Sequence, residues 1–256
     1  LEHNFADESV AFLLNPAGVA SSEITFSGGK KDRIKEIYIA DYDGANKTQV
    51  THHNAISIRP EFSPNGLFIA YLSYKDRFPF LYVYDRNTGK STPLSTRSGL
   101  NHSPAWSPDS SKIALTLSKD GNTEIYLKNP DGTGEQRLTD DKGSDSSPTF
   151  SPDGRQLAFV SDRAGRPNIY VMNTDGTNVH RISRQGGSAY DPAWSPDGNS
   201  IAYIVEKEGE GLELYTMNPD GTNVRQLSSS GGSNESPAWS ADSRHIMFSS
   251  DPSGGT

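Results

Sequence analysis

The residues of this chain best suited to chemistry are its six histidines, since it contains no cysteine. Imidazole is a common metal ligand and a common proton carrier. His52, His53 and His102 fall in loops that could share one face of the protein. Adjacent His52 and His53 point in opposite directions in an extended chain, and no third ligand recurs with them. We therefore expect surface histidines, with no metal and no cofactor.

The carboxylates also lack the pattern of a reactive site. Asp41, Asp43 and Gly44 resemble the start of a calcium loop, but the further acidic ligand and the terminal Glu of an EF-hand are missing. The sequence has no Gly-x-Ser-x-Gly elbow, His-Glu-x-x-His motif, phosphate-binding loop or Cys-x-x-Cys pair. The sequence therefore predicts turns at the Asp-Gly pairs, no catalytic residue, and a protein that is not an enzyme.

The elements that carry these residues repeat along the chain. Ser147-Pro148-Thr149-Phe150-Ser151-Pro152-Asp153 has close copies elsewhere, whose first prolines stand at positions 60, 104, 148, 192 and 237. The period is 44 residues with one single-residue slip, and an Ile-Tyr or Leu-Tyr pair keeps step with it. A fixed period of this size indicates a repeat architecture.

Each repeat reads as four short strands joined by turns. Ser151-Pro152-Asp153-Gly154 has typical turn chemistry, because proline fixes φ and glycine accepts positive φ. Four-stranded units of about 40 to 45 residues are typical of propeller blades. We label the strands A to D from the axis outwards, and we predict an all-β propeller. The A-strand aromatics are expected to pack between blades rather than against a ligand: Phe62, Trp106, Phe150, Trp194 and Trp239.

The strand count predicts a six-bladed propeller whose last blade is cut short. The predicted blades cover residues 24–51, 57–95, 101–139, 145–183 and 189–228, with a partial blade at 234–250. They contain 21 strands, whereas a six-bladed ring needs about 24 and a five-bladed ring about 20. Residues 1–18 are expected to be the terminal helix and linker of a preceding domain, and residues 19–256 the propeller.

Composition excludes several function classes. The formal net charge is −8, and a nucleic-acid binder needs clustered Lys and Arg to neutralise phosphates. No apolar run reaches the length of a membrane span. Hydrophobic residues make up only 32% of the chain, which thin blades with many polar turns would explain. We expect neither nucleic acid nor a membrane span.

The repeat resembles that of the TolB family. The resemblance rests on Phe150-Ser151-Pro152-Asp153-Gly154 through Asp175-Gly176-Thr177, and on the flanking segments at residues 2–7, 24–26 and 40–44. It implies a periplasmic protein of the Tol-Pal envelope system, which acts in envelope integrity, cell division and protein transport. It further implies binding of the peptidoglycan-associated lipoprotein Pal through the propeller. Family members contact TolA through an N-terminal segment that this sequence lacks, which puts that contact in doubt.

The repeats vary on one face only. The A–B and C–D turns are uniform, whereas the D–A and B–C loops differ between blades and should lie around the channel mouth. Varied loops on a uniform scaffold are typical of a binding face. We predict that a partner docks there, with His102 and Tyr190 as anchors. The predicted partner-binding residues are Arg59, His102, Ser103, Ser146, Ser147, Arg163, Arg166, Tyr190, Asp191, Glu235 and Ser236.

Two other functions remain open at this level. The same repeat is similar to the propellers that gate serine peptidases of the α/β-hydrolase type, and to those of related lyases. A peptidase would carry a nucleophile elbow in a separate catalytic domain. The reading frame on either side of this chain would therefore separate these alternatives from a binding protein.

Overall fold

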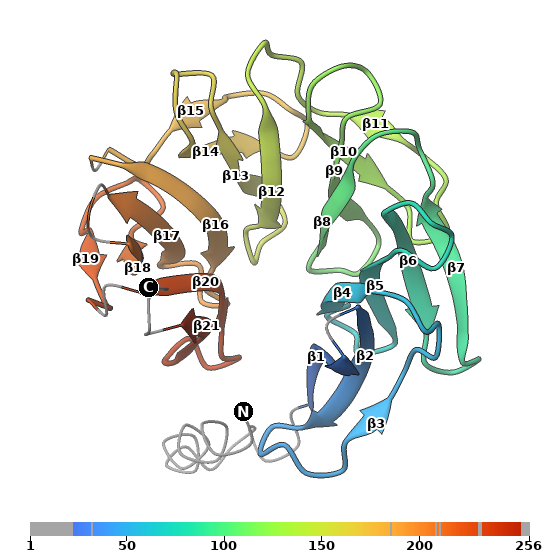
Figure 1. Ribbon diagram of the computed structural model, residues 1–256. Coiled ribbons are helices and arrows are strands. Elements are labelled where there is room, and N and C mark those ends of the chain that lie inside the picture. Colours follow the sequence, from blue (N-terminus) through green and yellow to red (C-terminus); the bar gives the residue numbers. More distant parts are fainter. Residues whose placement is uncertain are drawn as a thin grey trace.

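The computed structural model describes residues 23–31, 33–184, 186–207, 209, 211–229 and 232–251. These residues form an all-β propeller, whose blades follow one another around an arc from β1 to β21 (Figure 1). The helix predicted within residues 1–18 lies outside the described residues. In the part of the chain that is described, no helix is long and apolar enough to cross a membrane.

The described strands number 21 and form five sheets, in which all strand pairs but one, in the fifth sheet, are antiparallel. The first sheet has three strands: β1 (Glu23–Lys31), β2 (Ile34–Asp41) and β3 (Thr48–Gln49). The second has four: β4 (Ser57–Phe62), β5 (Phe68–Ser73), β6 (Phe80–Asp85) and β7 (Lys90–Ser95). The third also has four: β8 (Asn101–Trp106), β9 (Ile113–Leu117), β10 (Glu124–Lys128) and β11 (Gln136–Arg137).

The fourth sheet repeats this order and the fifth extends it. The fourth consists of β12 (Asp145–Phe150), β13 (Gln156–Ser161), β14 (Asn168–Asn173) and β15 (His180–Arg181). The fifth has six strands: β16 (Ser188–Trp194), β17 (Ile201–Lys207), β18 (Gly211–Met217), β19 (Arg225–Gln226), β20 (Ser233–Trp239) and β21 (Ile246–Asp251). Strands β4, β8, β12, β16 and β20 face the centre of the arc (Figure 1).

The prediction of a six-bladed ring with a truncated last blade is wrong for this structure, which has five blades. The hairpin of β20 and β21 does not form a sheet of its own, because it joins the fifth sheet through a parallel pairing of Leu212 with Ser233. Short β19 pairs only with Tyr215 and Thr216 of β18, so Leu212 is free to pair elsewhere. The Leu212 N–H also donates to the Gly232 carbonyl at 3.0 Å.

The A–B turns are built as the sequence predicts. In the fourth blade, Ser151 Oγ donates to Asp153 Oδ1 at 2.6 Å, and the Gly154 N–H donates to the Ser151 carbonyl at 2.9 Å. Gly154 has a φ of 71°, a left-handed conformation that glycine adopts without strain. The same Ser-to-Asp bond recurs at Ser107 and Ser195, which explains why these turns are uniform.

The hydrophobic core lies between the blades. Trp106 is only 4% exposed and packs with Leu81 and Val83 of the second blade as well as Leu115 of its own. The other four A-strand aromatics each pack against a cluster of buried residues: Phe62, Phe150, Trp194 and Trp239. The prediction that these rings form inter-blade core is therefore confirmed for the first four rings in the chain, whereas Trp239 packs against residues of its own sheet.

Candidate functional site

A β-bulge interrupts every complete A strand at the same repeat position. The register of β8 against β9 shifts between His102 and Ala105, so that Ser103 and Pro104 leave the ladder. Proline has no N–H to donate, and A strands form the inner edge of each sheet, where proline is tolerated. The bulge and the proline together discourage another strand from pairing with this edge.

The residue before each of these prolines adopts a left-handed backbone. Its φ is 53° at Arg59, 50° at Ser103, 50° at Ser147, 47° at Asp191 and 54° at Ser236. This conformation costs a residue other than glycine roughly 1–2 kcal/mol. The sequence analysis missed the feature, because period-2 alternation does not reveal a bulge. The Pro at a fixed place inside a predicted strand was the available signal.

The structure places most of the predicted partner-binding residues at one end of the blades. Arg59, Ser103, Ser147, Asp191 and Ser236 occupy the bulges. The residues before them pair with the last part of each B strand: His102 with Thr116, Ser146 with Val160, Tyr190 with Ile204 and Glu235 with Ser249. A strands begin where B strands end, so the D–A and B–C loops share this end, which we call the bulge face.

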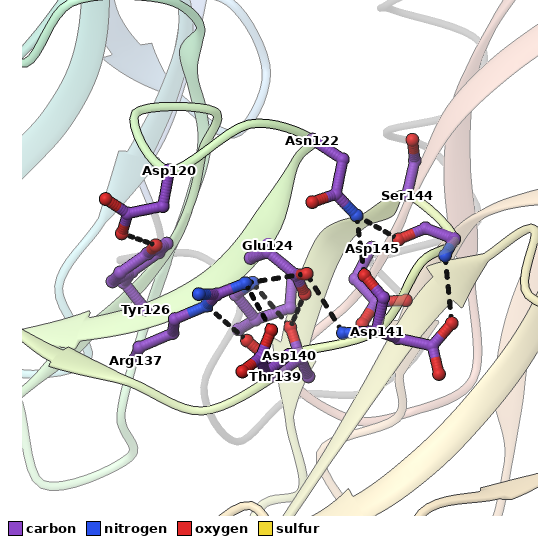
Figure 2. A network of polar contacts seen from close by, with 12 residues as sticks. Asp120, Asn122, Glu124, Tyr126, Arg137, Thr139, Asp140, Asp141, Ser144 and Asp145 are labelled. Carbon is purple, nitrogen blue, oxygen red and sulfur yellow. Dashed lines mark hydrogen bonds and ion pairs between the residues drawn. The ribbon is translucent and has the colours of Figure 1, made fainter.

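Hydrogen bonds connect the two kinds of loop on the bulge face. Asn122 of the third B–C loop donates through Nδ2 to the carbonyl of Asp141, at 2.9 Å, and to that of Gly143 (Figure 2). In the next blade, Asp162 accepts a hydrogen bond from the Ser144 N–H at 2.6 Å. The two loop types therefore form one connected surface.

The two predicted anchors have different polar surroundings. Burial and, to a smaller extent, the positive charge of Arg59 on the neighbouring A strand lower the pKa of His102 to about 4. His102 is consequently neutral near pH 7, and its Nδ1 lies 2.8 Å from Ser103 Oγ. The Tyr190 hydroxyl donates to Glu206 Oε2 at 3.1 Å, and burial raises its pKa.

Arg163 and Arg166, which belong to the fourth B–C loop, differ from each other. Arg163 forms an ion pair with Asp145 at 2.7 Å, and its guanidinium lies 5.1 Å from the centre of the Tyr170 ring. Arg166 is exposed and lines a cavity of about 650 Å³ between the fourth and fifth blades. Arg163 is therefore held by its own blade, whereas Arg166 is available at the surface.

A buried polar network supports the D–A loop of the third blade (Figure 2). Glu124 is fully buried and accepts hydrogen bonds from Thr139 Oγ1 at 2.6 Å and from the Asp141 N–H at 3.1 Å. Arg137 pairs with the same carboxylate at 3.0 Å. In the first blade, Glu36 likewise accepts a hydrogen bond from the hydroxyl of Thr51. The sequence analysis missed this network, although Glu stands before the Ile-Tyr pair in both repeats.

A cavity that contains none of these residues lies elsewhere. It has a volume of about 1280 Å³ and is lined by the A–B turn prolines and the five A-strand aromatics, but by none of the predicted partner-binding residues. Glu61 also lines it, where the other repeats have Ala or Thr. Glu61 accepts a hydrogen bond from the Trp106 N–H at 3.1 Å, and burial raises its pKa to about 8.

The histidines do not converge on a metal site. Nε2 of His53 lies 3.1 Å from the Tyr71 hydroxyl, and burial lowers the pKa of His53, whereas His52 is exposed. Among the described residues, no three side chains of His, Asp or Glu are grouped so that they could hold a metal ion. What the described site offers instead is a rigid polar surface with two half-buried rings.

Comparison with known proteins finds a matching family model, relatives in sequence and similar solved structures. A family model described as the TolB beta propeller domain matches residues 16–254. The Protein TolB homolog of Chlorobium chlorochromatii is 39% identical over 74 residues, which are 29% of this chain and 17% of that protein. The crystal structure of TolB from Acinetobacter baumannii superposes with a TM-score of 0.83 at 28% identity, over 95% of this chain and 62% of that one.

More distant structures share the fold alone. The tricorn protease matches with a TM-score of 0.67 at 18% identity, over 88% of this chain and 24% of that one. An oligogalacturonate lyase in complex with manganese matches with a TM-score of 0.63 at 18% identity, over 87% of this chain and 66% of that one. In the curated relatives, by comparison, the matched segment spans less than a fifth of the protein's length.

Proposed function

The chain belongs to the TolB beta propeller family, and we propose that it is a non-catalytic, protein-binding propeller of the Tol-Pal system. Relatives of about 38% identity over 78 residues carry the name Tol-Pal system protein TolB. On this proposal the protein works in the periplasm, where it contributes to envelope integrity and cell division. Its partner there is the peptidoglycan-associated lipoprotein Pal.

One observation carries the choice of the bulge face. Each of the five bulges presents one side chain at the same position of the repeat, in a strand that pairs antiparallel with the strand after it. The displayed side chains differ, from Arg59 and Ser103 to Asp191. A constant backbone with varied side chains on one face supports recognition of a protein surface there.

His102 and Tyr190 are the proposed anchors. Both are half-buried aromatic rings at A-strand positions next to a bulge, so they lose little conformational entropy when a partner covers them. His102 is neutral near pH 7, which lowers the cost of burying it in an interface. Arg59 and Arg166 are exposed cations that could pair with acidic groups of the partner around these rings.

The test is binding of purified Pal to this protein, expressed from its complete reading frame, by calorimetry. The double variant His102→Ala, Tyr190→Ala should lose about 2 kcal/mol or more of binding free energy, because it removes both anchors. The control alters Asn173 and Asp175, which build an exposed C–D turn on the opposite face, and should bind normally. If only the control variant lost binding, the interface would lie on the opposite face and its assignment to the bulge face would be wrong.

The alternative is a propeller that gates a serine peptidase or belongs to a lyase. Its support is the likeness of fold to the tricorn protease and to oligogalacturonate lyase. A reading frame that continues into a domain with a nucleophile elbow would favour the peptidase. Metal-dependent turnover of oligouronides would favour the lyase.

A further inference from the structure

A cation lies against a tyrosine at the B–C corner of four blades. The distance from the cationic group to the ring centre is 3.8 Å for Lys75 and Tyr82, and 4.9 Å for Lys119 and Tyr126. The same arrangement recurs at Arg163 and Tyr170 at 5.1 Å, and at Lys207 and Tyr215 at 5.2 Å. In sequence the cation stands seven residues before the tyrosine, or eight in the last case.

An aspartate completes the arrangement in the second and third blades. The Tyr126 hydroxyl donates to Asp120 Oδ2 at 2.6 Å (Figure 2). Lys119 Nζ lies 2.5 Å from the same carboxylate oxygen. In the second blade, Tyr82 donates to Asp76 at 2.5 Å. We call Lys75, Asp76 and Tyr82, and likewise Lys119, Asp120 and Tyr126, the clasps of these two blades.

The tyrosine is the fixed part of each clasp. Tyr82 and Tyr126 are each 1% exposed, and each is anchored in a central C strand. Burial raises the pKa of both hydroxyls far above neutral pH, and the bonded aspartate raises it further. Each hydroxyl therefore remains protonated and donates to a loop carboxylate from a ring that cannot move.

The clasp is connected to the bulge face through the rest of its loop. The third B–C loop, residues 118–123, contains Asp120 and also Asn122, which bonds two carbonyls of the following D–A loop. Within the loop, the Gly121 N–H donates to the Ser118 carbonyl at 3.3 Å. The Tyr126 ring is thereby connected, through Asp120 and Asn122, to both loop types.

We propose that the clasps are positioning residues, which hold the B–C loops and the attached D–A loops in the conformation that binds the partner. This inference rests on the proposed function of the bulge face. Loops that are already ordered lose less entropy on binding, so a clasp increases affinity without touching the partner. The clasp residues are therefore distinct from the anchors His102 and Tyr190.

The experiment removes one hydroxyl. Tyr126→Phe keeps the ring beneath Lys119 and deletes only the bond to Asp120. Amide hydrogen exchange over residues 118–123 should become about tenfold faster, and the affinity for purified Pal should fall about fivefold. Lys119→Met should act in the same direction, whereas Lys119→Arg should retain wild-type behaviour because it preserves the cation over the ring.

The matched control is Tyr38→Phe in the first blade. Tyr38 holds the same strand position, but its hydroxyl faces Gln49 at 3.4 Å and its cation is Lys47, which comes from the C–D side. This variant should leave loop exchange and Pal affinity unchanged. Each variant is measured at the same interval below its own melting temperature, so that a difference in global stability does not affect the comparison.

Two results would overturn the inference, and a third would overturn the proposed function on which it rests. Unchanged exchange in Tyr126→Phe would show that the clasp does not hold the loop. Faster exchange with unchanged Pal affinity would show that the clasp has no part in binding. If the unaltered protein fails to bind Pal, the proposed function fails instead, and the exchange data still report separately whether the clasp orders the loop.

Discussion

Glu61 is the A-strand residue whose chemistry departs furthest from its repeat neighbours. The equivalent positions hold Ala105, Thr149, Ala193 and Ala238. At Glu61 a carboxyl group lies between two blades and accepts a hydrogen bond from the Trp106 N–H. Burial disfavours the charged form and raises its pKa from 4.5 to about 8.

This shift predicts the pH dependence of stability. Between pH 4.5 and about 8 the folded state retains a proton that the unfolded state has released, so the free energy of unfolding falls as pH rises. The contribution is complete below pH 4.5 and is lost as pH passes through about 8. Glu61→Gln keeps an acceptor for Trp106 and should remove this part of the slope.

Denaturant unfolding of the wild type and of Glu61→Gln at pH 5 and pH 8 measures the effect. The variant should gain stability relative to the wild type at the higher pH. Equal pH slopes in the two proteins would mean that Glu61 titrates near its ordinary value, and that its carboxylate is well solvated by the cavity.

The A-strand bulge yields a prediction at the scale of the element. Ser147 has a φ of 50°, and it precedes Pro148 in β12. Glycine adopts this conformation freely but loses more chain entropy on folding, so Ser147→Gly should change the unfolding free energy by less than about 1 kcal/mol. A β-branched residue fits this region poorly, so Ser147→Val should cost about 2 kcal/mol.

Urea unfolding of the two variants, side by side, provides the measurement. The difference between them is informative because both remove the same hydroxyl. If Val were tolerated as well as Gly, the bulge would have to relax to an extended strand in solution.

The elements could be predicted from the sequence to different degrees. Ile169-Tyr170-Val171 is a short apolar run between turn residues that recurs with the repeat, so the repeat period and the turn chemistry identify β14. The pairing of Leu212 with Ser233 could not be predicted, because it depends on how little of β18 the two-residue β19 covers. The wrong blade number follows from this, since counting strands does not tell which sheet the last hairpin joins.

The sequence predicted that most of the proposed binding residues share one end of the blades, but it did not predict their contacts. Loop variability led to the proposal of the bulge face, and the proline positions led to the residues beside it. The ion pair of Arg163 with Asp145 brings together residues 18 apart in sequence, and no periodicity encodes it. Likewise, the low pKa of His102 depends on burial and on Arg59 of another blade, which only the packed molecule reveals.

At the scale of the whole molecule, the stability of the blades should decrease from the axis outwards. Strands β11, β15 and β19 have two residues each and pair at two positions, whereas β9, β13 and β17 are buried and paired on both sides. Few contacts and exposed hydrogen bonds lower the free energy of local opening. Amides of the D strands should therefore exchange at least about tenfold faster than those of the B strands.

Hydrogen exchange read by mass spectrometry would resolve these strands in one experiment. The second blade supplies an internal comparison, because its outer strand β7 has six residues and pairs along most of its length. The amides of β7 should exchange more slowly than those of β11. Uniform protection from A to D would instead indicate that each blade opens as a single unit.

The recurrence of one bulge per repeat has a consequence for how such a protein can change over evolutionary time. Every bulge fixes its residue by backbone geometry and not by the identity of the side chain, as Arg59, Ser147 and Asp191 illustrate. On the proposed function, point mutations at these positions would alter what is recognised while the scaffold is inherited unchanged. A duplication of one 44-residue unit would add another display position of the same geometry. If the bulge face binds the partner, natural selection could change recognition with little effect on folding, as long as the new residue tolerates a left-handed backbone.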